Sequence, residues 1–137
     1  MSDIVNAMLQ AAGRHPIPTK AEQLHLGTLI QAGRQPDASP GQKRAGARAH
    51  KRLVEGNMRL AINIAKSFRR RSSGTALDFA DLIQESALGL NLAANKFDPS
   101  RGYSFSPMAT WWCRQALARA IVTQGQTIRT SLSIKWK

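Results

Sequence analysis

The stretch YSFSPMATWWCRQALAR, residues 103–119, decides how the rest of the chain is organised. Ser106 is a suitable N-cap and Pro107 suits the first helical position, where its missing N–H is not needed, so a helix is predicted to start there. At about 100° per residue, such a helix separates its small apolar residues from its large aromatic and polar ones. The small-residue stripe comprises Ala109, Cys113, Ala116, Leu117 and Ala120, and the other side comprises Met108, Trp111, Trp112, Gln115 and Arg119.

A single buried stripe about 100° wide cannot hold both of these sets of residues. One interpretation is a helix sandwiched between two layers, with both tryptophans in the core. The other is a platform on which bases stack, with Gln115 and Arg119 positioned for base edges or phosphates. No acidic residue occurs from Pro99 to the C-terminus. This one-sided positive charge favours the stacking platform.

The size and charge of the chain narrow the class of protein. Its 137 residues are enough for one domain with a buried core, and its formal net charge is +12. A balance this basic predicts a polyanionic partner, most simply a nucleic acid, with a membrane surface as the competing polyanion. No apolar run is long enough to span a bilayer and no signal-peptide pattern is present, so we expect no membrane partner. The single cysteine, Cys113, allows no intramolecular disulfide and is typical of a reducing cytoplasm.

Hydrophobic periodicity predicts an all-α fold, because no β pattern and no internal repeat occurs. Thr19 and Glu22 match a capping box, Asp78 matches an N-cap, and Gly33 matches a helix C-terminal stop. The predicted helices before residue 103 cover residues 3–12, 19–32, 42–71 and 78–95. The predicted domains are an N-terminal helical hairpin over 1–32, a linker over 33–41 and a main body over 42–137.

Two of these helices carry unusual faces. The 42–71 helix has ten basic residues against Glu55 alone, which indicates either a solvated face or contact with phosphates or an acidic protein. The 78–95 helix has acidic residues and leucines opposite its core stripe, namely Asp81, Glu85, Leu88 and Leu92. Either this face binds a protein, or a neighbouring helix covers the leucines.

The motifs of catalysis and metal binding are not found. The histidines, His15, His25 and His50, are scattered and are not grouped with cysteine or carboxylate clusters, so no metal site is expected. The sequence has no phosphate-binding glycine loop and no defensible catalytic carboxylate pair. We therefore expect no enzyme activity, no cofactor and no small-molecule substrate.

Three stretches resemble the second conserved region of bacterial housekeeping (sigma-70) sigma factors. They are LVEGNMRLAINIAKSF (53–68), DFADLIQESALGLNLAANKFDPSRGYSFSPMATWWCRQALARAI (78–121) and TIR (127–129). Residues 2–32 resemble the preceding region 1.2 of the same family. The resemblance implies a helical bundle of the region 2 type with a short N-terminal helical hairpin. It also implies a cytoplasmic transcription initiation factor without a cofactor.

The resemblance implies two partners for this bundle. The first is core RNA polymerase, whose beta-prime coiled coil the family binds through the helix that matches 78–95, with Asp81, Gln84 and Glu85 at contact positions. The second is promoter DNA, of which the family captures the non-template single strand at the minus-ten element. Gln115 and Arg119 match residues at the upstream duplex edge, and Asn57 and Leu60 match part of a pocket for a second flipped base. The remaining implied or candidate DNA-binding residues are Tyr103, Phe105, Trp111, Trp112 and Arg114.

The sequence departs from the family pattern in the central stretch. Pro107 and Met108 stand where the family usually has a small polar residue and an aromatic that stacks on the flipped adenine. Methionine offers no aromatic stack, whereas base–aromatic stacking is worth about 1–3 kcal/mol per base. Two alternatives therefore accompany the promoter-melting hypothesis. One is a truncated sigma homologue that occupies polymerase as a decoy or regulator, and the other is a protein that binds duplex DNA through the major groove.

Overall fold

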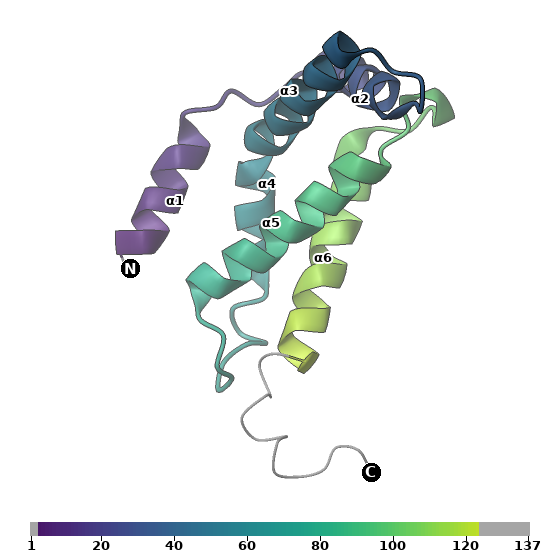
Figure 1. Ribbon diagram of the computed structural model, residues 1–137. Coiled ribbons are helices and arrows are strands. Elements are labelled where there is room, and N and C mark those ends of the chain that lie inside the picture. The colour runs from purple at the N-terminus through teal and green to yellow at the C-terminus, as the bar shows by residue number, and fades with distance from the viewer. Residues whose placement is uncertain (1–2, 124–137) are drawn as a thin grey trace, which may run out of the picture.

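The structure, a computed structural model, describes residues 3–123, which form six α-helices and one short 3-10 helix and contain no strand (Figure 1). The predicted all-α fold is therefore confirmed. The TIR motif, residues 127–129, lies outside the described residues. The elements are α1 (Asp3–Gly13), α2 (Lys20–Arg34), α3 (Pro40–Gly56), α4 (Met58–Ser67), α5 (Phe79–Lys96), η1 (Pro99–Arg101) and α6 (Phe105–Thr123).

The helices pack around α5, which crosses the middle of the molecule in Figure 1. Helices α4 and α6 both pack against α5 and against each other. Helix α2 packs against α3. Helix α1 lies at the edge and contacts α4 and α5. The largest fully buried side chains include Leu53 of α3, Leu82 and Leu90 of α5, and Leu117 of α6, so the core runs through all of the central helices.

Three helices begin with a complete capping box. At α2, the Glu22 N–H donates to Thr19 Oγ1 over 3.1 Å, as the sequence predicts. At α5, the Asp81 N–H donates to Asp78 Oδ1 over 2.9 Å, which confirms Asp78 as the N-cap. The third box, at Ser39 before α3, was not predicted. Each box satisfies N–H groups that a helix leaves without intrahelical partners.

The predicted single helix over 42–71 is wrong, because the chain forms α3 and α4 with a break at Asn57. The backbone of Asn57 has φ −110° and ψ 9°, and its side-chain N–H donates to the Leu53 carbonyl over 2.8 Å. The preceding Gly56 packs so closely that a Cβ there would lie 2.6 Å from Pro18 Cδ. The break between α3 and α4 therefore lies next to the point where Gly56 packs against the connection between α1 and α2.

The predicted helix stop at Gly33 is also wrong. Helix α2 continues to Arg34 and α3 starts at Pro40, so only residues 35–39 connect the two helices. A Cβ on Gly33 would lie 2.8 Å from the Gln42 carbonyl oxygen and 3.2 Å from Gly46 Cα. Gly33 therefore allows α2 and α3 to approach closely and does not end the helix. The division of the chain into domains at residues 33–41 stays a prediction.

Helix α6 starts earlier than predicted. It begins at Phe105, so Ser106 is not its N-cap and Pro107 is its third residue. Proline is tolerated there because the N–H groups of the first turn have no intrahelical acceptor. Phe105 is completely buried and meets Phe97 edge-to-face, with ring centroids 5.2 Å apart. The first residue of α6 is therefore anchored in the core.

Helices α4, α5 and α6 are joined by a short polar path inside the core. Ser86 Oγ of α5 donates to the Ala61 carbonyl of α4 over 2.7 Å. Cys113 Sγ of α6 donates to the Ser86 carbonyl over 3.3 Å, and burial raises the pKa of this thiol. The thiol therefore stays neutral and packs like a small apolar residue, as predicted.

We expect the substitution Gly89→Ala to destabilise the fold strongly. A Cβ at Gly89 would lie 2.6 Å from the Trp112 carbonyl oxygen and 2.7 Å from Cys113 Cα, and backbone atoms cannot rotate away. Forcing α5 and α6 apart should lower the free energy of unfolding by about 1–3 kcal/mol, measured by urea denaturation. The matched control is Gly41→Ala, because a Cβ there meets nothing closer than 3.8 Å. Equal stability of the two variants would contradict the tight α5–α6 contact.

Candidate nucleic-acid interface

The centre of the candidate interface is a pair of indole rings on α6, one exposed and one half-buried. Trp111 is 54% exposed, Trp112 is half-buried, and their rings are nearly perpendicular, at 86°, with centroids 5.0 Å apart. Behind them Ala109, Cys113 and Leu117 are fully buried against the bundle. The interpretation of α6 as a sandwiched helix with both tryptophans in the core is therefore wrong. Small residues anchor one side of α6 and leave the aromatic side open.

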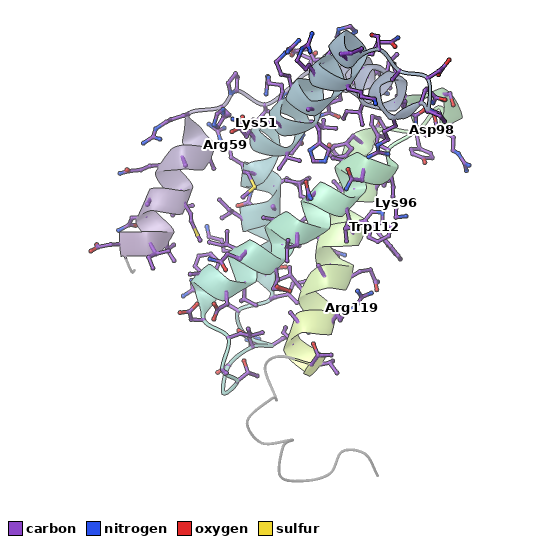
Figure 2. All side chains as sticks on the ribbon, viewed as in Figure 1. Lys51, Arg59, Lys96, Asp98, Trp112 and Arg119 are labelled. Atoms are coloured by element: carbon purple, nitrogen blue, oxygen red, sulfur yellow. The ribbon has the colours of Figure 1, made fainter. Side chains whose placement is uncertain are left out.

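Basic and polar groups surround the indoles. Lys96, at the end of α5, places Nζ 5.6 Å from the centre of the Trp112 ring, within the range of a cation–π contact. Arg114, Gln115 and Arg119 are exposed along α6. Figure 2 shows Lys96, Trp112 and Arg119 along the same side of the molecule. Lys96 was not among the predicted site residues, because only the packing of α5 on α6 brings it beside Trp112.

A tight turn between α5 and α6 leads into Tyr103. The Asp98 carboxylate accepts hydrogen bonds from the Ser100 hydroxyl, over 2.6 Å, and from the Ser100 N–H, over 3.0 Å. These two hydrogen bonds lower the pKa of Asp98 from its ordinary value. Gly102 then has φ +84°, in the left-handed region that favours glycine. Tyr103 follows with 43% exposure, and its ring centroid is 6.5 Å from that of Phe97.

The other predicted DNA-binding residues are buried or half-buried in the structure. Phe105 has no exposed surface and its ring meets Phe97 edge-to-face in the core, so its assignment to DNA binding stays a prediction that this buried position does not favour. Asn57 is 4% exposed at the α3–α4 break, where its side chain is bonded to Leu53. Leu60 is half-buried in α4 and packs against the core.

Helix α5 presents a second surface, which we call the α5 acidic face and define by Asp81, Gln84, Glu85, Leu88 and Leu92. Leu88 is 56% and Leu92 is 39% exposed, so the described helices do not cover these leucines as the alternative interpretation required. Gln84 is exposed and Glu85 is half-buried. Asp81 also has a structural task, because its Oδ2 accepts the Asp78 N–H over 3.0 Å in the capping box.

The basic residues predicted for one helix are distributed over α3, α4 and the turn that follows. Arg52 Nη2 lies 4.0 Å from Glu22 Oε2, and Arg52 Nη1 donates a hydrogen bond to the Pro16 carbonyl oxygen over 3.0 Å. Arg69 and Arg71 lie over the rings of Phe79 and Phe68, at 4.6 and 4.5 Å. Lys51 and Arg59 lie toward α1 in Figure 2, away from Trp112 and Arg119. Positive charge therefore covers several sides of the bundle.

Within residues 3–123, no group of three or more histidine, cysteine, aspartate or glutamate side chains is placed to hold a metal ion. None of the helices in this range combines the length and apolar character that crossing a bilayer requires.

Comparison with known proteins gives consistent matches. A family model described as Sigma-70 region 2 matches residues 53–127. The RNA polymerase sigma factor SigA2 of Synechococcus elongatus is 36% identical over 163 residues, which cover 98% of this chain and 50% of the relative. SigA of Lactococcus lactis subsp. cremoris is 42% identical over 130 residues, which cover 94% of this chain and 32% of the relative. SigA of Microcystis aeruginosa is 52% identical over 84 residues, which cover 61% of this chain and 19% of the relative. The chain thus spans half or less of the length of these relatives.

Proposed function

Because this chain belongs to the sigma-70 family, we propose that it binds core RNA polymerase and captures the unpaired non-template strand of the minus-ten promoter element. The observation that carries this proposal is the nearly perpendicular pair of indoles on α6, in which Trp111 is exposed and Lys96 lies over the ring of Trp112. Aromatic faces beside cations are the arrangement that single-stranded nucleic acids favour.

The indoles provide the stacking energy in this mechanism. The exposed Trp111 ring offers a face to an unpaired base, and Trp112, held against Lys96, forms the wedge at the edge of the duplex. Extruding a base costs a few kcal/mol, and stacking on an aromatic side chain returns about 1–3 kcal/mol per base. Gln115 and Arg119, farther along α6, contact the upstream duplex edge.

The net charge of +12 governs the first encounter with DNA. Each phosphate that a lysine or arginine neutralises releases a counterion, so binding weakens steeply as salt increases. Basic residues on several sides of the bundle attract the strand from different directions, and the aromatic surface of α6 selects the unpaired segment.

The α5 acidic face is the proposed polymerase-binding surface. Half-buried carboxylates beside exposed leucines on one helix suit a partner helix that offers basic and apolar side chains, such as one helix of a coiled coil. We assign the beta-prime coiled coil of core polymerase to this face. The assignment places the α6 aromatics and the polymerase contact on neighbouring helices of one rigid bundle, so docking to polymerase also sets the position of the indoles.

The decisive experiment compares single-stranded with duplex DNA. Fluorescence anisotropy with a labelled non-template minus-ten strand should give tighter binding than the same sequence as a duplex or as the template strand, by about tenfold or more. Binding of each should weaken as salt increases. Equal or tighter binding to the duplex would instead indicate a major-groove reader and would contradict the proposal.

One observation favours a second function, that of a decoy that occupies polymerase. Met108 is half-buried beside the core and stands where the family usually has the aromatic that stacks on the flipped adenine. Run-off transcription with core polymerase separates the two functions. An initiation factor yields a transcript that depends on the promoter, whereas a decoy only lowers transcription by another sigma factor.

A further inference from the structure

A cavity of about 220 Å³ lies between α2, α3 and the end of α5, and none of the residues that line it belongs to the indole pair or to the α5 acidic face. Arg34, Lys43, His50 and Asn95 line it together with the backbone of Gly33 and Gly46. The two glycines lie close to each other across α2 and α3, and because they have no side chains, neither fills the space. Arg34 and Lys43 are exposed residues, so the cavity reaches the surface of the molecule.

The guanidinium of Arg34 is held in place at this cavity. Its Nη2 donates to Asn95 Oδ1 over 2.7 Å, and its Nη1 donates to the Asn95 carbonyl oxygen. Both partners are neutral, so these bonds orient the arginine without neutralising its charge. An arginine has five N–H donors, and those that Asn95 does not use remain available to a ligand.

A second cation lines the same cavity without a carboxylate. Among the described residues, the ion pairs are formed by His15, Arg52 and Arg101, and none involves Arg34 or Lys43. Lys43 lies near the N-terminus of α3, whose first turn contains no acidic residue, and a positive charge is unfavourable at that end of a helix. Two cations that line one cavity repel each other unless an anion lies between them.

The third group is the imidazole of His50. Its Nε2 is the one buried side-chain nitrogen or oxygen, among the described residues, that has no hydrogen-bond partner. A buried polar atom without a partner has lost its hydrogen bonds to water and gained none in return, so such atoms are rare in native proteins. The His50 side chain is one of those that line the cavity, so an anion bound there would lie beside the imidazole ring.

We propose that this cavity binds a phosphate group. A guanidinium, an ammonium and an imidazole around one space offer several donors to an anion with several oxygen acceptors. The volume of about 220 Å³ exceeds the roughly 30 Å³ that one water molecule occupies in the liquid, so a group larger than a single water fits. The phosphate belongs either to a DNA backbone or to a small phosphorylated molecule, and the chemistry of recognition is the same for both.

The test is an NMR titration of the 137-residue chain with inorganic phosphate. Wild type should show saturable shifts of the His50 ring signals and of the Gly46 amide signal. The variants Lys43→Gln and His50→Gln should each weaken phosphate binding by about tenfold or more. The control Lys20→Gln makes the same charge change at an exposed position on α2 outside the cavity and should leave the titration unchanged. Shifts that do not saturate, or equal weakening by Lys43→Gln and Lys20→Gln, would overturn the proposal.

A second arm identifies the source of the phosphate. If the source is DNA, Lys43→Gln weakens binding of a single-stranded oligonucleotide and lowers its salt dependence by about one counterion, and inorganic phosphate competes with the oligonucleotide. If the source is a small molecule, a nucleoside diphosphate saturates the same NMR signals and Lys43→Gln leaves oligonucleotide binding unchanged. Both results support a phosphate site. Trp111→Ala should not alter the phosphate titration, so failure of this proposal is distinguishable from failure of the minus-ten proposal.

Discussion

Replacing both Trp111 and Trp112 with alanine is expected to abolish measurable binding to the single-stranded minus-ten element. Each lost stacking contact is worth about 1–3 kcal/mol, so the pair accounts for roughly 2–6 kcal/mol, or about 30-fold to 10⁴-fold in affinity. The two indoles form the aromatic pair of α6, with Trp111 exposed and Trp112 half-buried, and the completely buried Phe105 cannot replace them. Fluorescence anisotropy with a labelled non-template strand measures the effect.

Three companion variants make this result specific. The double substitution to phenylalanine should retain much of the affinity, because a smaller aromatic face still stacks. Val122→Ala, which removes a 63% exposed apolar side chain from the same helix, should leave binding unchanged. Because Trp112 is half-buried, its removal is expected to lower the stability of the fold as well as DNA binding. The single variant Trp111→Ala removes only the exposed ring and so tests stacking by itself, and circular dichroism checks that each variant is folded. Single-strand binding by the alanine pair that equals that of wild type would rule out the stacking surface.

The second large effect is expected at the α5 acidic face. The double substitution Glu85→Lys and Leu88→Asp should weaken association with core RNA polymerase by about 2 kcal/mol or more, since it reverses one charge and places another in the centre of the apolar patch. Leu88 is 56% exposed, so its replacement should leave the fold intact. Titration of fluorescently labelled chain with core polymerase measures the change, and urea denaturation confirms the fold.

Asp81 needs a different substitution from its neighbours. Its carboxylate accepts the Asp78 N–H in the capping box, so a lysine there would weaken the helix as well as the interface. Asp81→Asn removes the charge and keeps an oxygen acceptor for that N–H. The control Asp37→Lys reverses an exposed charge in the connection between α2 and α3, outside the α5 acidic face. If Asp37→Lys weakened polymerase binding as much as the double variant, net charge alone would explain the effect.

The local features of the fold were predictable because they depend on neighbours in the chain. Capping boxes join residues three positions apart, so Thr19 and Glu22, and Asp78 at α5, could be read without the structure. The separation of small and aromatic residues around α6 also follows from the helical period alone, and the burial of Cys113 and exposure of Trp111 agree with it.

The features that were not predictable depend on distant parts of the chain. The break at Asn57 goes with the packing of Gly56 against Pro18, and Gly33 stays helical because α2 lies against α3 at that point. Periodicity over 42–71 contains no information about either contact. Phe105 was assigned to the interface by its type and position, whereas its partner Phe97 comes from the end of α5 and places it in the core.

The sequence by itself determined the helical class, the two faces of α6, the acidic and apolar row on α5 and the family. Only the tertiary structure decided which aromatics are accessible, which lysine accompanies them and where a cavity is left between helices. The physical reason is that helical period and capping act over a few residues, whereas burial is set by which helices touch. Lys96 beside Trp112, and Arg34 beside Asn95, are contacts between helices, so only the packed bundle brings them together.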